Sequence, residues 1–469
     1  MKKKTETDRD ATRIKRRDFV KSGSAALAAG VAWGRSPMPE STACSESAVT
    51  SLFPVHPSQD GRIQSYRTLG RTGFRVSDIS LGASFLREPN LVRYAFDKGM
   101  NYIDTAESYA NGAAERAIRG ALRYVDREKV FIATKADIRP RDDKDSVLTR
   151  VRRSLAQLNT EYLDAYMMGG VSTAKLLNHP GYHAAMDQLK AEGRVRFTGV
   201  AYHGPEATDQ TGMADVLCAA VEDGRFDVLL LVYNFLNHSE GDRIIAAAKA
   251  KNVGTTAMKT APGKLRAEPF DPDSMSEVYR QYLTAMMRAG SSRAAALREL
   301  RTYSDAQNQF VERTQVFAER YGIENEEALQ LASIQWVLQN PDMHTACISA
   351  WNFDLIDKIV ALSGTQLTAP AEGLLQEAGS TLDSQYCRHG CVECMDSCPF
   401  DVPVSRIMRY AYYFETQGRE RHAMSAYATL DGPGAAPCKD CAGPCAGACR
   451  YGLRIQPNML QVHNLLTLT

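Results

Sequence analysis

Eight of the eleven cysteines in this 469-residue chain lie between residues 387 and 449, near its C-terminal end. They form two runs of four, with the spacings C-x3-C-x2-C-x3-C-P and C-x2-C-x3-C-x3-C. Thiolate sulfur is a preferred ligand of zinc and of iron–sulfur clusters, and ligands at such short intervals can converge on one centre. The candidate metal ligands are Cys387, Cys391, Cys394, Cys398, Cys438, Cys441, Cys445 and Cys449.

The two runs resemble those of bacterial two-cluster ferredoxins, in which each C-x2-C-x2-C-x3-C-P run gives its fourth cysteine to the other cluster. Each run here has one interval lengthened by one residue, and the second run lacks the proline. The same exchange predicts two 4Fe–4S clusters. The first would be held by Cys387, Cys391, Cys394 and Cys449, and the second by Cys438, Cys441, Cys445 and Cys398.

Zinc and disulfide bonds are the alternatives for these cysteines. Zinc tetrathiolates fit the count, but paired zinc ribbons separate one C-x2-C from another instead of forming runs of four. Disulfides between cysteines three or four residues apart are strained. The spacing therefore favours iron–sulfur clusters, and the lengthened intervals leave open that one cluster is absent or holds three irons.

The cysteine runs belong to a predicted C-terminal domain over residues 366–469. Residues 405–430, between the runs, have the pattern of a helix, so we expect a mainly α-helical iron–sulfur domain. Turns at Gly390, Gly443 and Gly447 would let backbone amides point at the sulfurs and stabilise the negative charge of a cluster.

The front end of the chain is basic. The pair Arg16-Arg17 is followed by Phe19 and by a short apolar stretch rich in Ala and Gly. This pattern resembles a twin-arginine (Tat) export signal, and the alternative is a solvated basic tail before a short helix. The Tat route carries folded proteins, so metal could be installed before the thiols meet an oxidising compartment.

We assign residues 1–45 to this signal segment and residues 46–65 to a linker, since residues 36–62 are rich in Pro, Ser and Ala. The resemblance implies export by the Tat machinery to the periplasm or the outer face of the bacterial inner membrane. Cys44 follows Ser-Thr-Ala, which is a poor match to a lipoprotein cleavage site.

The overall charge and hydropathy exclude some classes of partner. A formal net charge of +1 argues against a nucleic-acid-binding surface and against a polybasic membrane patch. Outside the front end, no apolar run approaches the roughly 20 residues of a membrane-spanning helix. We therefore expect no nucleic-acid partner and no transmembrane span in the mature chain.

The middle of the chain alternates short β-branched runs with helical patterns. The predicted strands begin at residues 76, 101, 130, 163, 195, 226, 253 and 344. Eight strand–helix units predict an α/β fold, a (β/α)8 TIM barrel over residues 66–365. A doubly wound open sheet is the alternative, but no G-x-G-x-x-G follows the first strand. Residues 262–325 would form an insertion, either a peripheral decoration or a lid or dock for the next domain.

Polar residues stand at the ends of the second and third predicted strands. Asp104 ends the second, Tyr109 lies in the loop after it, and Lys135 closes the third. Barrel enzymes carry their chemistry at the C-terminal ends of the strands, so these side chains should lie together. A lysine beside a tyrosine lowers the pKa of the phenol, and an aspartate keeps the ammonium charged. The set predicts a proton donor usable near neutral pH.

The barrel region is similar to the aldo/keto reductase superfamily. The similarity rests on "NYIDTAESYANGAAERAIRGAL", "VFIATK", "YLDAYMMGGVS" and "GRVRFTGVAYHG" and covers roughly residues 66–365. It implies a (β/α)8 barrel that reduces aldehydes and ketones with NADPH, with Tyr109 as the general acid beside Asp104 and Lys135. Combined with the twin-arginine pattern and the two cysteine runs, the similarity indicates a member of this superfamily that is exported by the Tat route and carries a C-terminal 4Fe–4S ferredoxin-type domain.

The chain departs from the family at the substrate carbonyl. The family's histidine after the fourth strand falls on Gly169, which cannot donate a side-chain hydrogen bond. His203, which ends the fifth strand, is the nearest imidazole that could replace it. We therefore include His203 among the candidate catalytic residues, and a purely structural histidine is the alternative.

The chain also departs from the family at the cofactor. The family's Ser-Asn pair falls on Ala201-Tyr202, its glutamine near Leu230 and its ring-stacking tyrosine near Met258. No basic residue stands in "SAWNFD" after the eighth strand. These departures argue against ordinary NADPH-dependent reduction and leave NADP(H) and flavin open as organic cofactors.

Two functions are consistent with these features. The first is an exported oxidoreductase that passes electrons between a substrate at the barrel mouth and a redox partner through two 4Fe–4S clusters. The second is a non-catalytic electron-transfer protein whose barrel is a degenerate scaffold. The three catalytic residues favour the first function, and the departures from the family favour the second.

Overall fold

The computed structural model describes residues 61–467, apart from 206–210, 263–269, 276, 289 and 322–324. The predicted signal segment and most of the predicted linker lie outside the described residues. Within the described part of the chain, no helix is both long enough and apolar enough to cross a bilayer.

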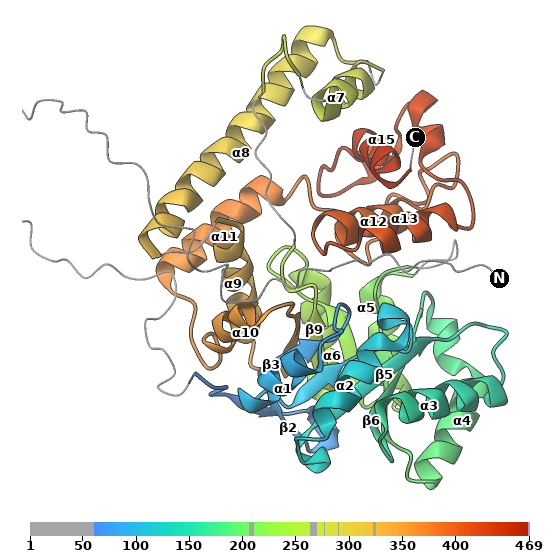
Figure 1. Cartoon of the computed structure of the whole chain (residues 1–469). Coiled ribbons are helices and arrows are strands. Elements are labelled where there is room, and N and C mark those ends of the chain that lie inside the picture. The colour runs from blue at the N-terminus through green and yellow to red at the C-terminus, as the bar shows by residue number, and fades with distance from the viewer. Residues whose placement is uncertain are drawn as a thin grey trace, which may run out of the picture. The chain divides into compact units, whose positions relative to one another are not determined.

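Eight parallel strands close into a barrel (Figure 1), which confirms the predicted (β/α)8 fold. Pairing of the last strand with the first closes the ring, with Ala346 beside Ile79. Most strand residues are buried and apolar, as expected for parallel strands covered on both sides. The strands are β3 (Ile79–Gly82), β4 (Tyr102–Asp104), β5 (Phe131–Asp137), β6 (Leu163–Gly169), β7 (Val195–Ala201), β8 (Val228–Val232), β9 (Gly254–Met258) and β10 (Thr345–Ser349).

Helices between the strands surround the barrel. Several begin at capping side chains: Asp143 accepts from the amide of Ser146, and Asn352 accepts from the amide of Leu355. The helices are α1 (Pro89–Asp97), α2 (Ala113–Leu122), α3 (Lys144–Leu158), α4 (Pro180–Ala191), α5 (Met213–Asp223), α6 (His238–Ala250), α9 (Asn325–Leu338) and α10 (Phe353–Val360).

An N-terminal hairpin closes the barrel at the end opposite the predicted site. Strand β1 (Tyr66–Thr68) pairs antiparallel with β2 (Arg75–Ser77). Phe74 packs against Phe131 with ring centroids 5.3 Å apart, and Phe131 stacks on Tyr102 at 5.2 Å. This aromatic floor leaves the C-terminal ends of the strands as the open mouth.

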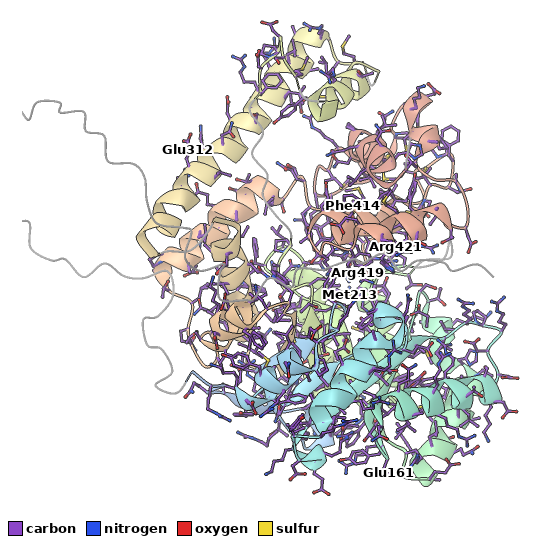
Figure 2. The ribbon with its side chains drawn as sticks, in the orientation of Figure 1. Glu161, Met213, Glu312, Phe414, Arg419 and Arg421 are labelled. Carbon is purple, nitrogen blue, oxygen red and sulfur yellow. The ribbon has the colours of Figure 1, made fainter. Side chains whose placement is uncertain are left out.

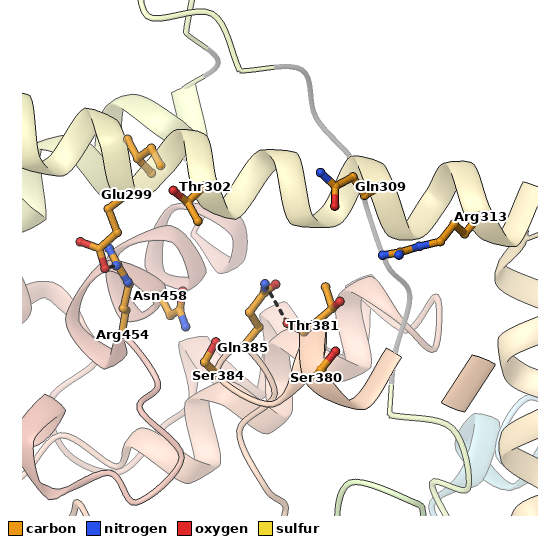
Figure 3. Close-up of a pocket in the computed structure, with 11 residues that line it drawn as sticks. Glu299, Thr302, Gln309, Arg313, Ser380, Thr381, Ser384, Gln385, Arg454 and Asn458 are labelled. Carbon is orange, nitrogen blue, oxygen red and sulfur yellow. Dashed lines mark hydrogen bonds and ion pairs between the residues drawn. The ribbon is translucent and has the colours of Figure 1, made fainter. Parts of the chain in front are cut away.

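The insertion contains helices α7 (Glu277–Arg288) and α8 (Arg293–Tyr321). Helix α8 lies along a polar pocket whose other walls come from α11 (Ala369–Leu382) and the start of α15 (Ile455–Leu466), as Figure 3 shows. Ion pairs Arg313–Glu377 and Arg454–Glu299 join the helix to these walls. Of the roles predicted for the insertion, its contacts match a dock for the C-terminal region.

The C-terminal region is helical, as predicted. The single helix predicted over residues 405–430 is instead two, α12 (Val404–Glu415) and α13 (Glu420–Ala428). The chain turns between them at Gly418, whose φ of +58° favours glycine. A short α14 (Cys445–Ala448) precedes α15. Side chains from all of these elements form a hydrophobic core separate from that of the barrel.

Candidate functional site

The three predicted catalytic residues come together at the barrel mouth. The Lys135 Nζ lies 2.5 Å from Oδ1 of Asp104 and donates to the carbonyl of Thr105 at 2.9 Å. The same Nζ lies 5.0 Å from the centre of the Tyr109 ring. Asp104 and Lys135 are 5% and 3% exposed, so the ion pair is held in a largely water-free site. The structure thus brings these three residues together, as their positions at the ends of the strands predicted.

The protonation of this set differs from the prediction in one respect. Burial raises the pKa of Tyr109, and the nearby charges of Lys135 and Arg419 offset this only in part. The predicted lowering of the phenol pKa is therefore wrong in net direction, because desolvation outweighs the attraction of the cations. For Lys135, burial lowers the pKa, but the adjacent carboxylate of Asp104 outweighs it and raises the pKa. The site holds a neutral phenol beside a charged ammonium.

His203 shares the cavity of about 70 Å³ that Asp104 and Tyr109 line. It follows β7, at the same end of the barrel. Burial, and after it the cations Lys259 and Lys135, lower the pKa of His203 well below its ordinary value. The imidazole is therefore neutral, and a neutral imidazole can donate from one nitrogen and accept at the other. All four predicted catalytic residues thus converge on one site.

The glycine that replaces the family's histidine is packed tightly. Gly169 ends β6, and a Cβ added there would lie 2.9 Å from Oδ1 of Asp137 and 3.1 Å from the carbonyl oxygen of Ala136. Both distances are shorter than ordinary side-chain contacts. A larger residue at this position would require a rotation of the exposed Asp137 side chain and a shift of a few tenths of an ångström at Ala136.

Sequence reasoning missed several residues that line the same cavity. Lys259 follows β9, is 8% exposed and has a φ of +51°, a backbone region that non-glycine residues rarely adopt. Tyr413, Gln417 and Arg419 reach the cavity from the C-terminal helices. Figure 2 shows Arg419 on the side of these helices that faces the barrel. The position of Lys259 at a strand end was a usable signal, whereas nothing local in the sequence brings α12 to the mouth.

Hydrogen bonds fix the C-terminal region over the barrel mouth. The Tyr412 hydroxyl donates to the carbonyl of Ala261 at 3.1 Å, just after β9. Asn234 donates to the hydroxyl of Tyr386 at 3.3 Å, and the first amide of α5, Met213, donates to the carbonyl of Gly390 at 3.3 Å. These bonds hold the C-terminal region against the barrel, where Tyr413, Gln417 and Arg419 form a wall of the candidate cavity.

The cavity lacks the contacts by which the family holds nicotinamide. Ala201 and Tyr202 are fully buried, and the Tyr202 hydroxyl donates to the backbone carbonyl of Thr211 at 2.8 Å. Leu230 and Met258, which replace the expected glutamine and tyrosine, give the cavity wall apolar surface. These four positions therefore supply none of the polar contacts by which the family holds the nicotinamide carboxamide.

The first predicted set of cysteines gathers at one pocket, which lies among Cys387, Cys391, Cys394 and Cys449. Burial, and then the neighbouring thiolates, raise the pKa of Cys394 to about 12. Cys449 is 51 residues beyond Cys398 in sequence, yet it joins the first run as the predicted exchange requires.

The second predicted set also lies together. Burial, and then the other thiolates of the set, raise the pKa of Cys438 to about 12, and Cys398 is one of those thiolates. Backbone amides point at two of the sulfurs: Val402 donates to Cys398 Sγ at 3.4 Å, and Gly443 donates to Cys441 Sγ at 3.4 Å. The predicted approach of an amide at Gly443 is confirmed.

All eight clustered cysteines are free thiols, so the disulfide alternative is wrong for this structure. Among the described residues, no group of three or more His, Cys, Asp or Glu side chains is placed to hold a metal ion.

A row of aromatic rings connects the first cysteine set with the catalytic cavity. His389, two residues after Cys387, lies 4.7 Å from the ring centroid of Tyr412. The rings of Tyr412 and Tyr413 are 6.2 Å apart, and Tyr413 lines the catalytic cavity. His389 also contacts Tyr386 with centroids 5.7 Å apart. The two candidate sites are therefore linked by contiguous side chains.

Comparison with known proteins identifies the family of the barrel. The model of the aldo/keto reductase family matches residues 85–377. Among curated proteins, the chain is 30% identical over 157 residues to the probable aldo-keto reductase 1 of Glycine max, a match that covers 29% of this chain and 45% of that protein. It is 28% identical over 148 residues to the uncharacterized oxidoreductase YqkF of Bacillus subtilis, covering 29% and 47%. The chain thus spans about half the length of these curated relatives.

Solved structures show more distant similarity. The aldo-keto reductase AKR11C1 of Bacillus halodurans is 19% identical, with a TM-score of 0.47 over 67% of this chain and 95% of that one. An aldo-keto reductase of Klebsiella pneumoniae, solved in complex with NADPH, is 22% identical, with a TM-score of 0.46 over 70% and 100%. Since the family model covers more than half of the chain, the chain belongs to the aldo/keto reductase family of oxidoreductases.

Proposed function

We propose that this protein is an exported iron–sulfur oxidoreductase. It passes electrons between a small-molecule substrate in the barrel cavity and a redox partner, through two 4Fe–4S clusters held by the eight C-terminal cysteines. The observation that carries the proposal is the convergence of Cys449 with Cys387, Cys391 and Cys394 at one pocket. That grouping is the exchange that the spacing of the two runs predicts for a pair of clusters.

The spacing of the cysteines favours a cluster over a zinc ion. Each run holds four cysteines within twelve residues, whereas paired zinc ribbons separate one C-x2-C from another. The thiols of the first set line one pocket, which agrees with a shared centre.

Burial of the cysteines and hydrogen bonds from backbone amides would stabilise clusters at these positions. Cys394 and Cys445, one from each set, are buried, and the amides of Val402 and Gly443 point at sulfurs. Such amides stabilise the negative charge of a thiolate-bound cluster. A bound 4Fe–4S cluster would supply one-electron transfer.

In the barrel cavity, the residues are arranged to hold and move a proton. Tyr109 carries a phenolic proton next to the charged ammonium of Lys135, which Asp104 holds in place through its 2.5 Å contact. The neutral imidazole of His203 lines the same cavity and can donate a hydrogen bond to a carbonyl oxygen. It would take the role that the family gives to the histidine replaced by Gly169. Tyr109 then acts as the general acid for a carbonyl oxygen.

The aromatic row supports coupling between the two sites. Rings of His389, Tyr412 and Tyr413 lead from the first cysteine run to the cavity with centroid separations of 4.7 and 6.2 Å. Reduction of a carbonyl to an alcohol consumes two electrons and two protons. The redox partner would supply the two electrons, which two one-electron clusters could pass on one at a time. Tyr109 would give one proton to the oxygen, and the carbon would take the other from solvent.

The alternative is an electron-transfer protein with an inactive barrel. The tight packing at Gly169 and the loss of the family's nicotinamide contacts favour it. In that case the clusters would exchange electrons with a partner, and the cavity would have no turnover.

Anaerobic purification tests the metal content. The protein should be brown and contain equal amounts of iron and acid-labile sulfide, about eight of each per chain. Protein with zinc in place of iron and sulfide would refute the proposal. Analysis of the same material for released NADP(H) or flavin determines whether an organic cofactor accompanies the clusters.

Turnover distinguishes the enzyme from the carrier. Oxidation of a reduced viologen dye is followed with a panel of short aldehydes and oxo acids as acceptors. The parent should turn over at least one of them, and Tyr109→Phe, which removes the phenolic proton, should lower kcat at least 100-fold. A parent with full clusters but no turnover across the panel would favour the carrier.

Export is the part of the proposal that depends on residues 1–45. A reporter that is active only outside the cytoplasm, fused to these residues, should require both Arg16 and Arg17 and the Tat translocase. A reporter that stays inside the cell would contradict the assigned location.

A further inference from the structure

The walls of the catalytic cavity come from two parts of the chain. The barrel contributes the ends of its strands, with Tyr109, His203 and Lys259, and the C-terminal helices contribute Tyr413 and Arg419. The barrel by itself does not contain the C-terminal wall of the cavity. Its chemistry therefore adds to what the family fold provides.

The charged side chains that line the cavity are mostly basic. Among the described residues that line it, Asp104 is the single carboxylate, and Lys135 already neutralises it through the 2.5 Å ion pair. Lys259 and Arg419 then add two positive charges to the lining. A third cation, Arg409, is 2% exposed, and its guanidinium lies against Gly204, next to His203, so closely that a Cβ there would collide with it.

Arg419 is held in position by aromatic rings. Its guanidinium carbon lies 5.0 Å from the centre of the Tyr413 ring and 5.9 Å from that of Phe85. Such contacts orient an arginine while leaving its N–H groups available to a planar anion. The position is therefore suited to bidentate contact with a carboxylate.

Lys259 approaches the cavity from the opposite, barrel side. Its Nζ lies 3.5 Å from the carbonyl oxygen of His203 and 5.7 Å from the centre of the Tyr413 ring. Its left-handed backbone, directly after β9, is a costly conformation of the kind that is kept at functional sites. Lys259 and Arg419 thus face the same small space from two elements, 160 residues apart in sequence.

We propose that this cavity binds a small anionic carbonyl compound, such as a short 2-oxo acid, with its carboxylate between Arg419 and Lys259 and its carbonyl oxygen toward Tyr109 and His203. The inference rests on the proposed function for the role of Tyr109 and adds the class of substrate. A cavity of about 70 Å³ has room for only a few heavy atoms, which favours two- or three-carbon acids. Cations desolvated in such a site discriminate against neutral compounds of the same size.

Equilibrium binding tests the inference without relying on turnover. Glyoxylate and methylglyoxal are compared by calorimetry on anaerobically purified, full-length protein, because both are small aldehydes and only glyoxylate carries a carboxylate. Glyoxylate should bind at least 10-fold more tightly than methylglyoxal. Arg419→Gln and, separately, Lys259→Gln should each weaken glyoxylate binding about 10-fold or more and change methylglyoxal binding less than 2-fold.

A matched control is available in helix α13, which begins directly after Arg419. Arg421 is exposed on α13, two residues from Arg419, so Arg421→Gln removes the same charge outside the cavity. It should leave glyoxylate binding within 2-fold of the parent. An equal loss in all three variants would show a general charge effect and overturn the inference.

Two further outcomes would also overturn it. Unchanged glyoxylate binding in both cavity variants would exclude a role for these cations in anion recognition. Loss of NADPH binding with unchanged glyoxylate binding would assign the cations to a dinucleotide diphosphate instead of a substrate. If glyoxylate binding depends on Arg419 while the protein lacks clusters or turnover, the anion site stands and the proposed function fails.

Discussion

Gly169 and Asp137 are in such close contact that a Cβ added to the glycine would lie 2.9 Å from the Oδ1 of the aspartate. These residues end neighbouring strands, since Asp137 of β5 pairs with Gly169 of β6. The family's histidine would stand at Gly169. A side chain at position 169 would therefore require its neighbours to move, and His203, which follows the next strand, β7, places an imidazole at the same end of the barrel.

We predict that Gly169→His destabilises the protein and does not improve turnover. Overpacking at a tight position costs about 1–3 kcal/mol, and the carbonyl of Ala136 at 3.1 Å from the added Cβ cannot move away without shifting a strand. Thermal unfolding of the cluster-loaded protein measures the effect. Gly373→Ala is the control, because it lies in α11 with no atom within 4 Å of an added Cβ, so it should be neutral or stabilising. A Gly169→His variant as stable as the parent would contradict the packing argument.

The Asp104–Lys135 pair leads to a second prediction. Lys135→Met would leave a buried carboxylate without its partner, which costs about 3–5 kcal/mol. Asp104→Asn combined with Lys135→Met removes both charges and should recover a large part of that stability. Thermal unfolding compares the stability of the two variants. Loss of turnover in both, although the double variant recovers stability, would show that the pair has a catalytic role as well as a structural one. Equal destabilisation of the single and double variants would contradict the coupling.

The exchange of cysteines between the two runs gives a third prediction. Cys449→Ser should remove the cluster of the first run, and Cys398→Ser the cluster of the second. Each variant should retain about half of the iron and acid-labile sulfide of the parent. Cys218→Ser is the control, because Cys218 is a half-buried thiol in α5, outside both sets, and it should retain all of both.

Electron paramagnetic resonance of the reduced variants can assign each cluster to its ligands. If Cys449→Ser disturbed the cluster of Cys438 and Cys441 instead, each run would bind its own cluster without exchange. That result would leave the metal assignment intact and refute the ligand sets.

The barrel could be predicted because each strand carries its own signal. Runs such as Val228–Val232 are continuous apolar segments, and eight strands separated by helical patterns leave few alternatives to a closed barrel. Asp104 and Lys135 could be placed for the same reason, since the strand ends define their neighbourhood. The ligand sets followed from a spacing rule that the positions of Cys398 and Cys449 match.

The cavity could not be predicted in full because its second wall is tertiary. Arg419 and Tyr109 line the same cavity although they are 310 residues apart in sequence. No local sequence pattern places α12 and α13 at the barrel mouth. The same wall explains the error in the phenol pKa. The desolvation of Tyr109 depends on the residues that bury it. The sequence indicated the nearby lysine, but it did not show that the C-terminal region buries the phenol.

His344 gives a prediction about pH. It precedes β10, and its Nδ1 accepts from the backbone amide of Thr255 at 3.0 Å. Burial, and after it the charge of Arg67, lower the pKa of His344 to about 4. Because an unfolded histidine titrates near 6.5, the unfolded state binds more protons between about pH 6.5 and pH 4. Stability is therefore fully present above the unfolded pKa and is lost as pH falls through this window.

The expected contribution of His344 is about 1–3 kcal/mol, lost between roughly pH 6.5 and pH 4. His344→Asn tests it, because the Oδ1 of asparagine can accept from Thr255 but does not titrate in this range. Thermal unfolding of parent and variant is followed at half-unit intervals from pH 7.5 to the acid limit of cluster stability. The variant should show a shallower decrease in Tm below pH 6.5 and should overtake the parent at the acid end. Parallel curves for the two proteins would show that another group governs the acid response.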